Sequence, residues 1–166
     1  ILGTSMKSVG EAMAIGRNFK ESLQKALISL EVGFSGLDRI FDLSKKQIEK
    51  KLKENIPNKL LIVAEAIRKK FNLKRIFALS KIDPWFLEQI KEIVDTENMI
   101  KKKGLPNDFV EFNRIKSIGF SDKKLSELTK ASEEIVRRKR TALKILPVFK
   151  KVDTCAAEFK SFTPYM

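Results

Sequence analysis

The sequence predicts an all-α fold: an irregular multi-helix domain of two packed helical subdomains, with short extended segments at both ends. Three observations predict it. Apolar residues recur at three- and four-residue spacing through most of the chain. Asn, Ser or Asp stands directly before several of these stretches, where a side chain can cap a first turn. Gly or Pro stands after several of them, where helices commonly end.

The best-defined helix is expected to start after Asp83 and to end before Gly104. Asp83 can accept hydrogen bonds from first-turn amides, and Pro84 suits the first helical position because no N–H is needed there. The apolar face consists of Phe86, Ile90, Ile93 and Val94. Because a Trp or Phe covers roughly 150–250 Å² of apolar surface, we expect Trp85 and Phe86 to lie in the core. An exposed aromatic recognition site is the alternative.

Four shorter helices are expected before it. They begin after Asn18, after Ser44 (whose partner Gln47 completes a capping box) and after Asn58, and the last covers residues 73–79. The expected inward-facing residues are Phe19, Leu23, Ala26, Leu27 and Leu30 in the first, Ile48 and Leu52 in the second, and Leu60, Ala64, Ile67 and Phe71 in the third.

Three helices are expected after it. The first runs from Asn107 to Gly119, with Phe109, Phe112 and Ile115 facing inward. Two short capped helices follow at 121–129 and 132–140. Such a pair resembles a DNA-binding helix-turn-helix, and an ordinary αα corner is the alternative. The second helix starts with two carboxylates and carries four consecutive cations that point around it, which favours the corner.

Composition narrows the possible functions. The 34 lysines and arginines outnumber the 21 aspartates and glutamates and give a net charge of +13. A polyanionic partner would suit this charge, so a basic helical nucleic-acid-binding module remains the alternative function. Lysine runs such as 45–53 are nevertheless common on solvated helix faces. Our first expectation is no nucleic acid and no membrane, because no run approaches the ~20 apolar residues of a membrane span.

The residue types needed for catalysis are scarce. The chain has no His and one Cys, which excludes His-based acid–base chemistry, a Ser-His or Cys-His pair and a zinc cluster. It has no GxxxxGK[ST] or GxGxxG phosphate-binding loop. The sequence therefore offers no catalytic, cofactor-binding or metal-binding residue. The single Cys155 suits a reducing, cytoplasmic setting.

Both ends are expected to be extended and to continue into a longer polypeptide. Residues 6–17 and 148–159 are rich in small and apolar residues without helical periodicity, and the chain has no initiator Met. Glu11 stands inside the first run. A carboxylate buried there would need a partner or a water-filled space.

Three sequence blocks together resemble the large subunit of carbamoyl-phosphate synthase. They are MKSVGEAMAIGR at 6–17, KIDPWFLEQIKE at 81–92 and VDTCAAEF at 152–159, and their order and approximate separations also match. GFSD at 119–122 is a further match, whereas 34–57 matches poorly. The other departures are conservative and stand at Ala12, Phe149 and Lys151.

The resemblance implies a division of the chain. Residues 1–33 would be the C-terminal edge of the carboxyphosphate synthetase (ATP-grasp) domain. Residues 34–151 would be the helical oligomerisation or connection domain, and 152–166 the start of the carbamoyl-phosphate synthetase domain. On this basis the piece is non-catalytic by itself and links two synthetase halves.

The resemblance also implies an activity and partners for the full enzyme. It would make carbamoyl phosphate from bicarbonate, glutamine-derived ammonia and two ATP, with Mg²⁺ or Mn²⁺ and K⁺, for arginine and pyrimidine biosynthesis. A glutaminase small subunit, the flanking synthetase domains and further copies of the chain would be its partners. Met6 and Glu11 would line an internal passage for carbamate, and a buried Glu11 held by an upstream Arg is the alternative.

Overall fold

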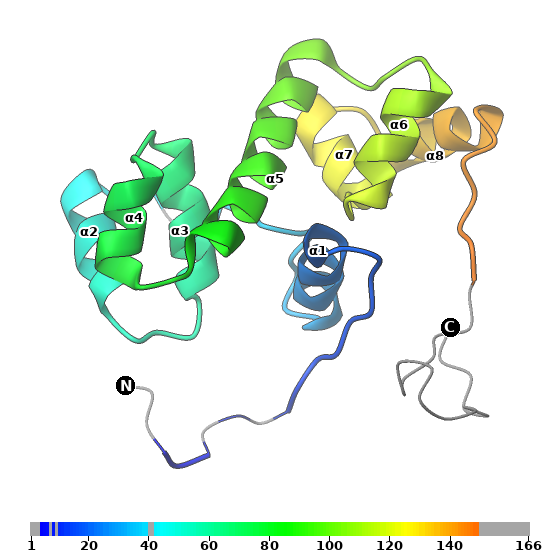
Figure 1. The fold of residues 1–166 in the computed structure, drawn as a ribbon. Coiled ribbons are helices and arrows are strands. Elements are labelled where there is room, and N and C mark those ends of the chain that lie inside the picture. Colours follow the sequence, from blue (N-terminus) through cyan, green and yellow to red (C-terminus); the bar gives the residue numbers. More distant parts are fainter. Residues whose placement is uncertain (1–3, 7, 9, 40–41, 150–166) are drawn as a thin grey trace.

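The computed structural model describes residues 4–6, 8, 10–39 and 42–149. Within these residues the chain forms eight α-helices and no strand, which confirms the all-α prediction (Figure 1). The helices are α1 (Phe19–Ser29), α2 (Lys45–Lys53), α3 (Lys59–Arg68), α4 (Leu73–Ser80), α5 (Pro84–Lys103), α6 (Phe109–Ser117), α7 (Asp122–Thr129) and α8 (Glu133–Ala142).

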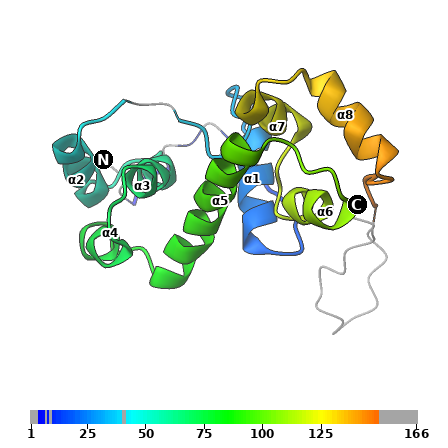
Figure 2. The ribbon, with the colours of Figure 1, turned by 90° about the horizontal axis from the view of Figure 1, so that it is seen from above.

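Helix α5 lies between two groups of helices. The first group, which we call the α2–α4 subdomain, packs against α5 on one side (Figure 1). On the other side α7 packs against α5, with α6 and α8 beside it, and we call these three helices the α6–α8 subdomain. Helix α1 packs against α5 as well, on the side of the second group (Figure 2). The prediction of two packed subdomains is therefore confirmed.

Side-chain caps explain where seven of the eight described helices begin, whereas the expected cap at Asn58 is not formed, since its side chain makes no capping hydrogen bond to α3. The Asn18 side chain accepts from the Glu21 amide at 3.0 Å, and the Asp83 side chain accepts from the Trp85 amide at 2.8 Å. Ser44 and Gln47 form the predicted reciprocal capping box. One start differs from the prediction, since α6 is capped by Asp108, one residue beyond the expected Asn107. An ionised carboxylate at this position also suits the positive end of the helix dipole.

One apolar stripe of α5 serves both groups of helices. Leu87, Ile90, Ile93 and Ile100 are fully buried, and Val94 is 1% exposed. Other fully buried side chains in the same core are Ile48, Leu52, Ile62 and Ile76 of the α2–α4 subdomain and Phe112, Ile115, Leu125 and Val136 of the α6–α8 subdomain. Because apolar burial is the main stabilising contribution to folding, α5 is the element on which both subdomains depend.

Four apolar side chains that we expected to be buried are exposed. Trp85 is 51% exposed and Phe86 is 40% exposed, so the prediction of a core position for both is wrong. Successive helical residues are about 100° apart, so with Leu87 facing inward its two predecessors fall to the side and the back. Leu30 and Phe109, at helix termini, are also about half exposed.

The chain before α1 is irregular. Residues 10–15 form no helix and no strand, and Met13 and Ile15 are exposed. The run predicted at the other end, 148–159, lies outside the described residues from position 150 onward, together with Cys155. None of the described helices combines the length and apolar character that a bilayer span requires.

Substitutions at two positions near the start of α5 test which side of this helix faces the core. We expect Leu87→Ala to lower the free energy of unfolding by about 2–5 kcal/mol, because it removes a fully buried side chain. Trp85→Ala should cost less, about 1–2 kcal/mol, because the indole is half exposed. Urea unfolding followed by far-UV circular dichroism measures both, and equal losses would contradict this orientation of α5.

Candidate functional site: the central ion network

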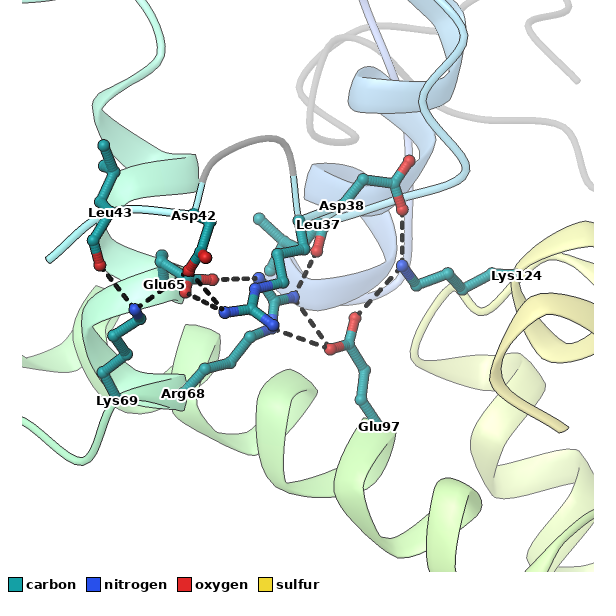
Figure 3. Close-up of polar contacts among 10 residues, drawn as sticks. Leu37, Asp38, Asp42, Leu43, Glu65, Arg68, Lys69, Glu97 and Lys124 are labelled. Carbon is teal, nitrogen blue, oxygen red and sulfur yellow. Dashed lines mark hydrogen bonds and ion pairs between the residues drawn. The ribbon is translucent and has the colours of Figure 1, made fainter.

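A buried ion pair joins α3 to α5 (Figure 3). The Arg68 Nη2 and Nε atoms donate to Glu97 Oε2 at 2.9 and 3.2 Å. The two side chains are only 12% and 3% exposed. Arg68 Nη2 also donates to the Leu37 carbonyl in the connection between α1 and α2. This guanidinium therefore ties three segments of the chain together.

The pair extends into both subdomains. In the α2–α4 subdomain, Glu65 Oε1 accepts from Arg39 Nη2 at 3.1 Å. Toward α7, Lys124 Nζ lies 3.5 Å from Glu97 Oε1 and donates to Asp38. We call these six charged residues the central ion network: Asp38, Arg39, Glu65, Arg68, Glu97 and Lys124. Glu97 is its midpoint, because it faces one cation from each subdomain (Figure 3).

The network also holds the connection that crosses from α1 to α2. The Ser35 amide and hydroxyl donate to Asp38. The Ser35 hydroxyl is 2.7 Å from Glu127 Oε2 on α7, and the Ser121 hydroxyl donates to the Ser35 carbonyl at 3.3 Å. The connection is thereby fixed against α7 by polar contacts rather than by secondary structure.

Three atoms of the network are buried without a hydrogen bond: Glu65 Oε2, Arg68 Nη1 and Glu97 Oε1. Each nevertheless faces an opposite charge, at 3.9 Å between Arg68 Nη1 and Glu65 Oε2 and at 3.5 Å between Lys124 Nζ and Glu97 Oε1. Buried charges are tolerated when they are paired, and removing one partner leaves the other uncompensated. The network therefore makes the joint between the subdomains depend on all of its members.

The electrostatics of Asp38 follow from its partners. Burial alone would raise the pKa of Asp38, but hydrogen bonds from Lys124 and from the Ser35 amide outweigh it and hold the pKa below its ordinary value. Asp38 therefore stabilises the fold in its ionised form.

A second charged cluster joins α6, α7 and α8. Asp122 accepts from Lys116 at 2.8 Å and from Arg140 at 3.1 Å. Burial would raise the pKa of Asp122, but the Lys116 and Arg140 cations lower it overall. Burial lowers the pKa of Lys116 in spite of Asp122. This cluster stabilises the α6–α8 subdomain internally.

Helix α1 is seated on the turn between α6 and α7. Gln24 is fully buried, and its side-chain amide donates to the Ile118 carbonyl at 2.7 Å. Gly119 has φ +98°, and a Cβ there would lie 3.0 Å from the Glu21 Cα. Only glycine therefore permits both this turn and the close approach of α1.

The central ion network holds helices together through paired charges. Its carboxylates face cations of the same network, and in the described part of the chain no group of three or more His, Cys, Asp or Glu residues is placed to bind a metal ion. Its contacts fix the positions of α3, α5 and α7 relative to one another.

The candidate passage residues lie elsewhere. Met6 is 83% exposed, and Glu11 is exposed and accepts from the Ser8 hydroxyl at 3.1 Å. Both belong to the segment before α1, and neither contacts the central ion network. Glu11 therefore has no need of an internal counter-ion in this chain, and its part in a carbamate passage stays a prediction.

The two capped helices at 121–129 and 132–140 are α7 and α8. The cations of α8 are engaged within the protein: Arg137 and Arg138 pair with Glu133 and Glu134, Lys139 donates to Asn107, and Arg140 pairs with Asp122. Phosphate binding would have to compete with these contacts. The arrangement favours the αα corner over a recognition helix.

Sequence reasoning missed the central ion network. Apart from Glu65 with Arg68, its ion pairs join residues 26 to 86 positions apart, as in Arg39 with Glu65 and Asp38 with Lys124. The available signal was Glu65, which stands inside the apolar run that forms α3. A carboxylate at such a position needs a cationic partner.

Acid unfolding tests the role of Asp38. Because its pKa is lowered in the folded state, its contribution to stability is complete above the ordinary value of 3.8 and is lost as the pH falls through the lowered folded value. We therefore expect Asp38→Asn to be less stable than the parent near neutral pH, with the difference shrinking below that value. Asp95→Asn, at a carboxylate 51% exposed that pairs with Lys91 on the same helix, is the control. A difference that stays constant down to pH 2 would refute this role.

Arg68→Met tests the joint itself. It should lower the free energy of unfolding by about 3–5 kcal/mol, because Glu97 is left buried beside an apolar side chain. Arg75→Met, which removes an exposed pair with Glu49, is the matched control and should change little. Thermal and urea unfolding compare the two variants. Equal stability for both would mean that the central ion network does not join the subdomains.

Comparison with known proteins identifies the family to which these helices belong. A family model described as the carbamoyl-phosphate synthetase large chain, oligomerisation domain, matches residues 11–144. The carbamoyl phosphate synthase large chain of Haemophilus ducreyi is 48% identical over 166 residues, which cover 99% of this chain and 15% of the relative. That of Brucella melitensis is 48% identical over 172 residues (100% and 15%), and that of Campylobacter jejuni is 45% identical over 171 residues (99% and 16%).

The matches cover a small part of the relatives but nearly all of this chain. The chain spans only about 15% of the length of these relatives. The matched region includes all eight helices and the central ion network. The chain belongs to the carbamoyl-phosphate synthetase large-chain family and contains its oligomerisation domain.

Proposed function

We propose that this chain is the non-catalytic connection and oligomerisation domain of a carbamoyl-phosphate synthase large chain. The full enzyme would make carbamoyl phosphate from bicarbonate, glutamine-derived ammonia and two ATP, for arginine and pyrimidine biosynthesis in the cytoplasm. The observation that carries the proposal is the family match over 11–144, which coincides with the two subdomains joined by the central ion network. A domain that spaces two active sites must keep its own parts in fixed relative positions.

Cofactors are assigned to other parts of the large chain. The full enzyme would use ATP, Mg²⁺ or Mn²⁺ and K⁺. Among the described residues no cluster of metal-ligating side chains is present, and the sequence has no phosphate-binding loop. We therefore infer that residues elsewhere in the large chain hold these groups, and that the described residues contribute by fixing positions.

The division of the chain follows the resemblance to the family. We assign 1–33 to the edge of the carboxyphosphate synthetase domain, 34–151 to the connection domain and 152–166 to the start of the carbamoyl-phosphate synthetase domain. The exposed, irregular run at 10–15 supports an edge that is completed by other parts of the large chain. Helix α1, although docked on the turn at Gly119, would then be the element that joins the first synthetase half to the connection domain.

Met6 and Glu11 are proposed to line the passage that carries carbamate between the two synthetase halves. Their exposure in this chain supports a position against another domain. The remaining partners would be the glutaminase small subunit and further copies of the large chain.

Sedimentation and an ATPase assay test the proposal on the chain itself. We expect a mass above 19.0 kDa that rises with protein concentration, a helical far-UV spectrum, and ATP hydrolysis no faster than in buffer. A monomer at every concentration would contradict the oligomerisation role. ATP turnover would contradict the non-catalytic assignment.

A further inference from the structure

A cavity of about 330 Å³ opens in the α2–α4 subdomain, between the start of α2 and the turn that joins α3 to α4. Its lining residues are Lys45, Lys46 and Glu49 of α2 and Lys70 and Phe71 of the turn. Three of these five residues are cations, and they come from two separate elements. A cleft lined mainly by charges of one sign concentrates ions of the opposite sign. The lining therefore favours an anion.

The three lysines that line the cavity are exposed and carry uncompensated charge. In the part of the chain that the structure describes, no carboxylate forms an ion pair with Lys45, Lys46 or Lys70. Glu49 also lines the cavity, but it is engaged by Arg75, whose Nε atom lies 3.0 Å from Glu49 Oε1. Lys45 and Lys46 stand in the first turn of α2, where their charges add to the positive end of the helix dipole. A bound anion would offset both.

The turn after α3 fixes the other wall of the cavity. Lys70 has φ +63°, a left-handed conformation at the position after a helix that glycine usually takes. The Lys70 amide donates to the Ile67 carbonyl at 2.9 Å, and the Phe71 amide donates to the Ala66 carbonyl at 3.0 Å. Phe71 is half-buried and packs against the core. A ligand would therefore meet a preformed wall and lose little free energy in ordering it.

The lining and the volume indicate the chemistry of the ligand. Lysine ammonium groups bind phosphate oxygens through charge-assisted hydrogen bonds. The Phe71 ring offers an apolar surface on which a second aromatic ring can pack. Pockets for small molecules have volumes of about 300–1,000 Å³, and this cavity lies at the lower end of that range. A small molecule that combines a phosphate group with one ring fits these features.

We propose that this cavity is a binding site for a small phosphate ester that carries an aromatic ring. Lys45, Lys46 and Lys70 hold the phosphate group, and Phe71 contacts the ring. None of the lining residues belongs to the central ion network, so the site does not depend on the proposed function of the domain. Because the ligand binds the folded subdomain, its binding also stabilises the packing of α2 against α3.

A titration followed by the amide NMR signals of this chain tests the site directly. The probes are phenyl phosphate, inorganic phosphate and phenol. We expect phenyl phosphate to shift the amide signals of residues 44–49 and 69–72, and to bind more tightly than inorganic phosphate. Phenol, which lacks the charge, should shift none of them. Shifts spread over lysines outside the cavity would overturn the proposal.

A matched pair of glycine variants separates binding from folding. Lys70 and Lys130 both have left-handed backbones directly after a helix, and Lys130 is exposed and lies outside the cavity. Glycine adopts this conformation without strain, so Lys70→Gly and Lys130→Gly should both keep or raise the thermal stability. Only Lys70→Gly should weaken the binding of phenyl phosphate, by about five-fold or more, because a charge-assisted hydrogen bond is lost. Equal affinity in the two variants would refute the site.

Phe71→Leu tests the contact with the ring. Leucine keeps an apolar side chain against the core but removes the aromatic surface. We expect this variant to bind phenyl phosphate no more tightly than inorganic phosphate. An unchanged preference for phenyl phosphate would contradict the role of Phe71. A duplex oligonucleotide that binds the parent and Lys70→Gly equally well, and displaces phenyl phosphate, would assign the charge to a wider surface for polymers and overturn the proposal.

Discussion

The central ion network that joins the two subdomains has one carboxylate at its midpoint. Glu97 is almost completely buried in α5 and faces Arg68 of the α2–α4 subdomain through one oxygen and Lys124 of the α6–α8 subdomain through the other. The apolar stripe of α5 gives each subdomain a surface to pack against. Apolar packing is not directional, so it does not fix the orientation of one subdomain relative to the other. Charged contacts do, because the hydrogen bonds from Arg68 to Glu97 and from Lys124 to Asp38 weaken steeply when their geometry changes.

Apolar contacts stabilise each subdomain and charged contacts orient the two subdomains, which suits a connecting domain. The α2–α4 and α6–α8 subdomains each have their own buried side chains, and α1 is fixed to the second through Gln24 and the turn at Gly119. If the domain spaces two active sites, a change of angle at the joint would displace whatever lies at the far end of α5. This helix is roughly 30 Å long, at about 1.5 Å per residue. Paired charges at the centre of the joint therefore suit a domain whose two halves must keep one relative position.

Local features of the sequence predicted the helices well. Asp83 with Pro84, Ser44 with Gln47, and Gly104 each mark a boundary through contacts within a few residues, and such contacts can be read from the order of amino acids. The predictions for exposure failed where the outcome depended on helix rotation. Trp85 is the largest side chain of its turn, yet the inward position is taken by Leu87, because the stripe must continue through Ile90 and Val94. The central ion network could not be predicted, because its partners meet only after the chain has folded.

Native-state hydrogen exchange gives the most direct test of the claim that Glu97 unites the subdomains. In the parent chain, the slowest amides of α3 and α7 should exchange with the same free energy of opening, because the two subdomains unfold together. In Glu97→Gln, the two values should separate, with one helix exchanging faster than the other. Values that remain equal in the variant, or that already differ in the parent chain, would contradict the account.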